Sequence, residues 1–236
     1  MNIEKRSIVI LFVFFLSCGK SIKTVTKVEN MYSKIKKELA PDKRTELFDI
    51  QFHLLNGAII LKGETTSKKA LLRLQDSLKY SQVNFKSEVR ILPDSSLENR
   101  QFAIAKNSVI NIRSNPKHSA ELGTQGLLGM TLRVLDKKGD FYRIQTPDNY
   151  ISWVDKGGIQ RMNKRDFDLW NASKKILFTN NVGHVFASKN KNSTIISDIT
   201  LGGVLKYVSE DASFYKVTYP DNRTGFIKKN EAIIYG

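Results

Sequence analysis

The sequence has few of the residues that most often perform catalysis or bind metals. Its 236 residues include one cysteine and three histidines. One cysteine excludes an internal disulfide, and a papain-like mechanism needs a cysteine paired with a histidine. Cys18 precedes every domain predicted below, and His53, His118 and His184 have no metal-ligand spacing to one another or to it. We therefore expect no catalytic residues, no metal site and no cofactor.

Acidic residues are also scarce. The chain has 38 Lys and Arg against 23 Asp and Glu, which gives a formal net charge of +15. Such an excess favours an acidic partner, and nucleic acid, anionic lipid and the carboxylates of cell-wall polymers all qualify on charge alone. Hydrophobic residues make up 41% of the sequence, which argues for packed cores and against a disordered chain.

A long apolar run is missing as well. The longest one near the start, residues 8–16, is too short to span a bilayer as a permanent helix. It follows Lys5 and Arg6 and precedes small residues, which is the order of a secretory signal. An exported protein is not expected to meet nucleic acid.

The end of this signal resembles a bacterial lipoprotein processing site, because Leu16 and Ser17 stand directly before Cys18. The resemblance implies that residues 1–17 are a signal peptide and that Cys18 is the lipid attachment site. The alternative is an ordinary signal peptide with an incidental cysteine. We expect the protein in the cell envelope, anchored to a membrane through this lipid and facing the periplasm of a Gram-negative bacterium.

Residues 18–25 read as a short polar tether, and residues 26–93 predict a small α+β domain. Its order is helix, strand, strand, helix, strand, with Thr26 in a capping position before the first helix and Asn56-Gly57 as a tight hairpin turn between the strands. This order, with its central "IILKGETTSKKALLRLQDSL", resembles the BON domain, an envelope-associated module. An unrelated small α+β domain is the alternative.

The rest of the chain contains a tandem repeat. An offset of 73 residues pairs the Phe-Tyr at 141–142 with that at 214–215, and the Pro-Asp-Asn at 147–149 with that at 220–222. Short alternating runs between turn residues predict small all-β barrels. The expected organisation is therefore a multidomain, mostly β protein. After a linker at 94–101 it has a first barrel at 102–162, a linking helix at 163–178 and a second barrel at 179–236.

The linking helix has its own signals. Asn163 is a suitable N-terminal cap, and Phe167 and Trp170 lie three residues apart, so both should point to one face.

The first repeat resembles the bacterial SH3-like (SH3b) domain. The residues that carry the likeness are NIRSNP at 111–116, Gly129, FYRI at 141–144 and SWV at 152–154. The second repeat keeps GFI at 225–227 but lacks the Arg-Ser-x-Pro loop, so it resembles a degenerate copy.

The wider stretch 100–236 resembles the non-catalytic N-terminal part of the NlpC-type γ-D-glutamyl-diamino-acid endopeptidases of Bacteroidetes. In those enzymes a papain-like domain follows paired SH3b domains.

Alternation along the repeated hairpin separates two faces. Tyr142 and Ile144 should face the core, whereas Phe141 and Arg143 should share the open face, where an aromatic ring and a cation could meet a sugar or peptide and its carboxylate. The alternative is that Phe141 covers interdomain packing or the linking helix, and that Trp153 lies half in the core. The candidate ligand-binding residues are Arg113, Phe141, Arg143, Tyr150 and Trp153.

The loop that contains Arg113 survives only in the first repeat. We therefore expect the first repeat to contact the ligand and the second to act mainly as a scaffold.

Three functions remain open. The first is a lipid-anchored, non-catalytic protein whose repeats bind peptidoglycan, its stem peptides or a cell-wall hydrolase. The second is the targeting half of an NlpC-type cysteine peptidase whose catalytic domain is missing or encoded separately. The third is an envelope adaptor that binds phospholipid or protein through the BON-like domain.

Overall fold

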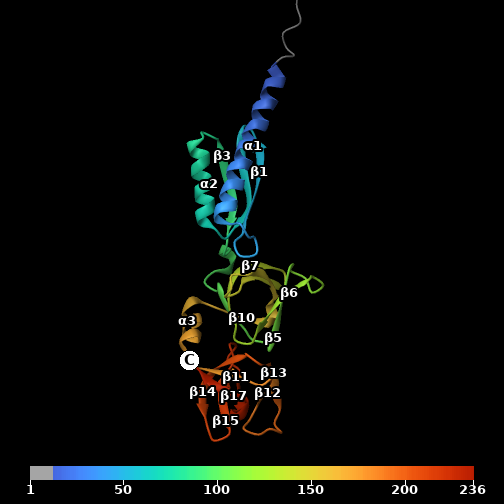
Figure 1. Cartoon of the computed structure of the whole chain (residues 1–236), viewed down its shortest axis with the longest axis vertical. Helices are drawn as coiled ribbons and strands as arrows, with labels where there is room; N and C mark the ends of the chain where they lie inside the picture. Colours follow the sequence, from blue (N-terminus) through green and yellow to red (C-terminus); the bar gives the residue numbers. More distant parts are fainter. Residues whose placement is uncertain (1–12) are drawn as a thin grey trace, which may run out of the picture. The chain divides into compact units, whose positions relative to one another are not determined.

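The computed structural model describes residues 13–236, with side chains from Lys23 onward, and it divides into two units between Leu92 and Pro93 (Figure 1). The chain is mostly β, with two large antiparallel sheets and few helices. Residues 1–12 and the side chain of Cys18 lie outside the described residues, so the predicted signal peptide and lipid attachment site stay predictions. No helix within the described residues is long and apolar enough to cross a membrane.

Unit 1, which ends at Leu92, has the predicted order of helix, strand, strand, helix, strand. Its sheet has the order β1-β2-β3, with β1 and β2 antiparallel and β2 and β3 parallel. The resemblance to a BON domain stays a prediction. The elements are α1 (Val13–Leu39), β1 (Phe48–Leu55), β2 (Ala58–Thr65), α2 (Lys68–Tyr80) and β3 (Phe85–Ile91).

Helix α1 begins earlier than the sequence indicated. It starts at Val13 and runs through the predicted tether at 18–25, so Thr26 lies inside the helix rather than at its N-terminal cap. From Lys20 to Leu39 no proline or glycine interrupts the chain, so nothing in the backbone favours an extended tether over a helix. The predicted end is correct, since the helix stops before Pro41.

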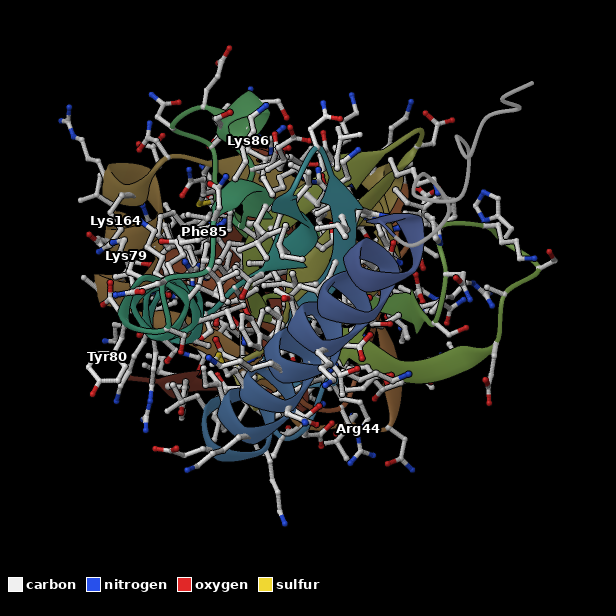
Figure 2. The ribbon with its side chains drawn as sticks, turned by 90° about the horizontal axis from the view of Figure 1, so that it is seen from above. Arg44, Lys79, Tyr80, Phe85, Lys86 and Lys164 are labelled. Carbon is white, nitrogen blue, oxygen red and sulfur yellow. The ribbon has the colours of Figure 1, made fainter. Side chains whose placement is uncertain are left out.

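The core of unit 1 forms where both helices cover the sheet. Leu71, Leu74 and Leu78 are buried along one side of α2, as their helical spacing predicts. Ser67 caps the helix by accepting a hydrogen bond from the backbone N–H of Ala70 at 3.4 Å. At the other end Tyr80 is 92% exposed, and its side chain points away from the ribbon in Figure 2.

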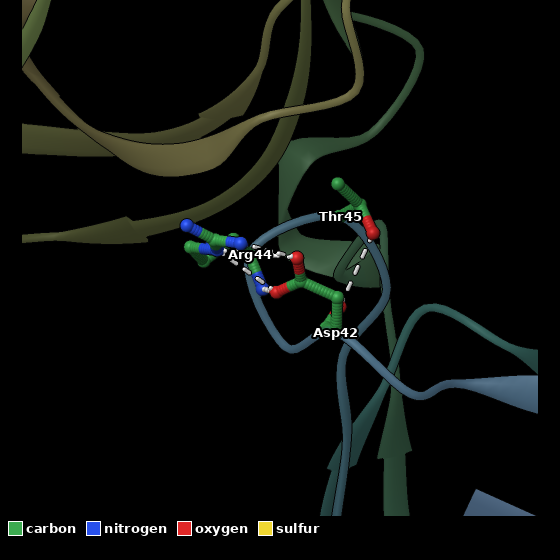
Figure 3. Close-up of polar contacts among 3 residues, drawn as sticks. All are labelled: Asp42, Arg44 and Thr45. Atoms are coloured by element: carbon green, nitrogen blue, oxygen red, sulfur yellow. Dashed lines mark hydrogen bonds and ion pairs between the residues drawn. The ribbon is translucent and has the colours of Figure 1, made fainter. Parts of the chain in front are cut away.

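Two local devices set the turns of unit 1. Asn56 and Gly57 both have positive φ, 50° and 76°, as a tight hairpin with two left-handed residues requires. In the loop between α1 and β1, the Asp42 carboxylate pairs with the Arg44 guanidinium at 2.8 Å, and its backbone carbonyl accepts from the Thr45 hydroxyl (Figure 3). Hydrogen bonds from Arg44 lower the pKa of Asp42 to about 2, so the pair persists at neutral pH.

Unit 2 contains two seven-stranded antiparallel sheets of identical topology. The first has the order β10-β4-β7-β8-β9-β5-β6, and the second repeats it with β17-β11-β14-β15-β16-β12-β13. The first sheet is built from β4 (Phe102–Ala105), β5 (Val109–Arg113), β6 (Leu122–Leu127), β7 (Thr131–Lys138), β8 (Phe141–Gln145), β9 (Ile151–Asp155) and β10 (Ile159–Met162). The second is built from β11 (Lys175–Phe178), β12 (Val182–Phe186), β13 (Ile195–Thr200), β14 (Val204–Glu210), β15 (Phe214–Thr218), β16 (Thr224–Lys228) and β17 (Ala232–Tyr235).

The 73-residue offset applies to the whole fold. Each strand of the second sheet begins 73 residues after its counterpart, and so does the short helix η3 (Lys229–Glu231) relative to η2 (Lys156–Gly158). The left-handed residues repeat as well, since Asn149 and Asn222 both have φ of 68°. We call residues 102–162 the first repeat and 175–235 the second repeat.

Two boundaries differ from prediction. Residues 175–178, expected at the end of the linking helix, form β11, so the second repeat begins before the predicted 179. The predicted linker at 94–101 contains a short helix, η1 (Ser95–Leu97), and Leu97 is buried in the core of the first repeat. Both errors have one cause. These segments are too short for their apolar residues to show the periodicity that identifies a helix or a strand.

The linking helix itself is confirmed as α3 (Lys164–Ala172), capped by Asn163. Trp170 is buried and Phe167 partly buried against β4, beside the two sheets of unit 2 (Figure 1). The buried Lys175 ammonium donates to the carbonyls of Trp170 and Ser173 at the C-terminal end of α3, where a cation is favourable. Burial lowers the pKa of Lys175.

The two repeats are joined through the turn after β6. Leu128 is 1% exposed because its side chain belongs to the core of the second repeat. Its carbonyl accepts a hydrogen bond from the N–H of Val204 at 2.9 Å. Gly129 beside it has φ of +87°, and a Cβ there would lie 2.2 Å from Cγ2 of Val204. The junction therefore needs a glycine for both its backbone conformation and its close approach.

We expect Gly129→Ala to destabilise unit 2. A left-handed alanine costs about 1–3 kcal/mol, and the clash with Val204 adds to this cost because backbone atoms must move. Urea unfolding measures the change in the free energy of unfolding. Gly139→Ala is the matched control, since Gly139 has φ of +57° but a Cβ added to it would meet no atom within 4 Å. Equal losses from both variants would show that the junction contributes nothing beyond backbone strain.

Candidate ligand-binding faces of the two repeats

Strand pairing brings three of the predicted ligand residues into one row. Arg143 on β8 lies opposite Trp153 on β9, and Trp153 lies opposite Arg113 on β5. The guanidinium carbon of Arg143 lies 4.7 Å from the centre of the Trp153 ring, within the range of a cation–π contact. The indole is 7% exposed, while both arginines are half-buried. We call Arg113, Arg143 and Trp153 the first-repeat row.

Arg113 also holds the loop that follows it. Its Nη1 donates to the carbonyl of Ala120 at 2.8 Å, and its own carbonyl accepts from the Ser152 hydroxyl. The hydrogen bond to Ala120 closes the loop after β5, which the sequence predicted to contact the ligand. This bond fixes the position of the remaining N–H groups relative to Trp153.

The prediction that Phe141 lies on an open face is wrong. Its side chain points to the same side of β8 as that of Arg143, but it is only 6% exposed. His118, from the loop after β5, packs on it with ring centroids 5.0 Å apart, and His118 Nε2 lies 3.6 Å from Asp155. The side of the strand was predicted correctly, and the neighbour that covers it comes from a loop 23 residues earlier in the sequence. Phe141 is therefore a packing residue and not an open contact surface.

The core side of the hairpin agrees with prediction. Ile144 is fully buried in the core of the first repeat, and Tyr142 packs partly against it. Tyr150 also packs on this core, and its hydroxyl lies so near Gly123 that a Cβ there would approach it to 2.5 Å. Tyr150 is thus half-buried in packing rather than a member of the first-repeat row.

The second repeat has the same row with different side chains. Lys216 lies opposite Phe226, and Phe226 lies opposite Phe186. Phe214, the counterpart of Phe141, is half-buried instead of buried, since no histidine covers it.

The lysines around Phe214 were not predicted from the sequence, although Lys189 and Lys191 alternate with asparagines in the loop after β12. Such a polar, basic loop is the signal that could have pointed to them.

Comparison with known families supports the class of the first repeat. Residues 112–159 match the family model of the bacterial dipeptidyl-peptidase Sh3 domain. This segment runs from β5 to the start of β10 and includes the first-repeat row. The match supports a relation of the first repeat to bacterial SH3 domains. None of the curated proteins matches the chain.

Solved structures that resemble the chain in part include two NlpC/P60 proteins. An NlpC/P60 family protein from Bacillus cereus ATCC 10987 is 20% identical, with a TM-score of 0.48 over 57% of this chain and 56% of that one. An NlpC/P60 endopeptidase from Photobacterium damselae subsp. piscicida is 11% identical, with a TM-score of 0.43 over 72% of this chain and 39% of that one. The chain thus spans about half of the first protein and less of the second.

We expect Phe141→Ala and Phe214→Ala to differ in their effect on stability. Phe141 is buried, so its truncation should cost about 3–5 kcal/mol of the free energy of unfolding. Phe214 is half-buried and should cost about 1–2 kcal/mol. Urea unfolding of both variants measures the difference. A small loss for Phe141→Ala would mean that its ring is open to ligand, as the strand alternation predicts.

Proposed function

We propose that this protein is a non-catalytic, lipid-anchored component of the cell envelope whose SH3 repeats bind peptidoglycan stem peptides. The observation that carries the proposal is the first-repeat row, two arginines on either side of one indole, inside the segment that matches a bacterial SH3 domain. The anchor at Cys18 and the exported address are proposed from the sequence alone.

The row suits a peptide that carries carboxylates. A guanidinium binds a carboxylate through two parallel hydrogen bonds, which an ammonium cannot do. Arg143 is held over the Trp153 ring, so less side-chain entropy is lost when a ligand binds. The aliphatic part of the half-buried arginine side chain offers apolar surface to the ligand backbone, and the indole, which is only 7% exposed, positions the guanidinium. Stem peptides contain both carboxylates and short apolar side chains, so they match the row in chemistry.

The non-catalytic part of the proposal rests on the residue inventory. The only cysteine of the chain is Cys18. The side chain of His118 is 77% exposed and packs on Phe141, where it lies beside Asp155 and no nucleophile. Thiol-based hydrolysis needs a thiolate and an imidazole within hydrogen-bond reach.

We expect Arg143→Ala to weaken binding to purified sacculi by about 1–3 kcal/mol, the range of an interface hot spot. The reason is the loss of the guanidinium that meets the carboxylate. Cosedimentation of the full-length protein in detergent with sacculi, over a range of sacculus concentrations, gives the affinity. Circular dichroism shows whether the variant is folded.

Arg133→Ala is the matched control for this experiment. Arg133 lies exposed on β7 of the same repeat, outside the first-repeat row, and its loss changes the net charge equally. Equal losses from both variants would mean that binding depends on net charge alone. No loss from either would place the function in unit 1 or in a protein partner such as a cell-wall hydrolase.

We expect Cys18→Ser to release the protein from the membrane fraction or to block signal processing. The physical reason is that acyl chains on the thiol supply the buried hydrocarbon that holds a lipoprotein on a bilayer. Fractionation of cells, together with metabolic labelling by palmitate, measures both. A wild-type protein that takes up no label would contradict the anchor without affecting the sacculus result.

A further inference from the structure

We infer that the second repeat has a carboxylate-binding pocket of its own, formed by lysines around Phe214. The inference rests on the proposed function, because it assigns the acidic part of the same ligand class to a second site. It also gives a binding role to the repeat that the sequence suggested was a scaffold.

The pocket has a volume of about 490 Å³ and is open to solvent. Small-molecule sites commonly occupy about 300–1,000 Å³. Three segments form it: the loop after β12, the turn that enters β15, and η3. Its main lining side chains are Lys189, Lys191, Phe214, Lys228, Lys229 and Asn230.

No acidic residue lines this pocket. Carboxylates that do not line the pocket pair with three of its lysines. Lys189 pairs with Asp211 at 2.9 Å, Lys228 with Glu231 at 2.9 Å and Lys229 with Glu210 at 2.7 Å. These pairs orient the ammonium groups while leaving N–H donors for a ligand, because each ammonium has three.

Two of these ion pairs, Lys189 with Asp211 and Lys229 with Glu210, contain a group whose pKa is shifted toward its charged form. The hydrogen bond from Lys189, with backbone N–H groups of Ser213 and Phe214, holds the pKa of Asp211 well below its usual range. The hydrogen bond to Glu210 raises the pKa of Lys229. A depressed carboxylate pKa and a raised lysine pKa both keep the pairs intact at neutral pH.

Lys191 differs from the other three lysines. It is exposed, and among residues 23–236, whose side chains the structure describes, it makes no ion pair or hydrogen bond. Its ammonium is therefore the most available cation for a ligand, and its replacement should not disturb packing.

The first repeat provides an internal comparison. At the 73-residue offset, His118 stands where Lys191 stands, and Asp155 stands where Lys228 stands. In the first repeat the histidine covers the aromatic ring and lies 3.6 Å from the aspartate. In the second repeat the ring of Phe214 is half-buried, no histidine packs on it, and a lysine replaces the aspartate. The same place in the fold is thus closed in one copy and open and basic in the other.

The charge and the aromatic ring of the pocket indicate which class of ligand it binds. Several ammonium groups around one half-buried ring favour a short peptide with more than one carboxylate and an apolar part that can rest on Phe214. Inorganic phosphate shares the charge but has no apolar part.

The test uses full-length protein in detergent with Arg143→Ala already in place, so that the first-repeat row does not contribute. Isothermal titration calorimetry with muramyl tripeptide gives the affinity. We expect Lys191→Glu to weaken binding about tenfold, because it replaces the attracting charge by a repelling one. The loss should shrink as salt rises, since exposed charges are screened beyond about 8 Å at physiological ionic strength.

Lys117→Glu is the matched control. Lys117 is exposed in the corresponding loop of the first repeat, and its substitution changes the net charge equally. We expect it to change the affinity less than twofold. Equal losses from Lys117→Glu and Lys191→Glu would overturn the inference, because binding would then follow net charge rather than the pocket.

Two further titrations identify the ligand chemistry. A muramyl tripeptide with its carboxylates amidated should not bind, and inorganic phosphate at the same concentration should not compete. Competition by phosphate equal to that by the peptide would overturn the assignment to carboxylates. An unchanged affinity of Lys191→Glu for the peptide, with sacculus binding that still depends on Arg143, would overturn the inferred pocket and leave the proposed function intact. If wild-type protein does not bind sacculi, the titration still shows whether the pocket binds the peptide.

Discussion

The packing of Leu128 into the core of the second repeat is the contact on which the structure of unit 2 depends. A small β repeat buries too little apolar surface to be very stable alone. Here the first repeat contributes a fully buried leucine to its neighbour, and the hydrogen bond to Val204 N–H fixes the approach. Gly129 is required because any side chain would occupy the space of Val204. The two repeats therefore share a core residue, and α3 packs beside the first sheet.

A shared scaffold allows the loops to differ. Strands, turns and the short helices keep one offset, while the loop after β5 and its counterpart after β12 differ in residue type. In the first repeat this loop places His118 on Phe141, and in the second Lys191 and the half-buried Phe214 line one pocket. Loops on a rigid sheet commonly hold binding residues for this reason. The duplication thus supplies two different surfaces without a second fold.

The charged residues of the second repeat contribute little to stability. Exposed ion pairs such as Lys189 with Asp211 contribute little to stability, because water and salt screen the two charges. The lysines can therefore exchange partners at small cost when an anionic group arrives. Burial works differently at Lys175, whose ammonium satisfies carbonyls at the end of α3 and is closed to solvent. The surface lysines are available to a ligand, whereas this one is structural.

The sequence by itself determined the duplication, the strand alternation, the Pro-Asp-Asn turns and the core side of each hairpin, because these depend on neighbouring residues and on a constant offset. It also placed Arg143 and Trp153 among the ligand candidates. Only the tertiary structure decided that Phe141 is buried and Phe214 only half-buried, since the residue that covers Phe141 comes from a loop distant in sequence. The role of Leu128 was likewise invisible, because its core belongs to another repeat. The direction of a side chain on a strand follows from its neighbours in sequence, whereas its burial depends on which distant segment packs against it.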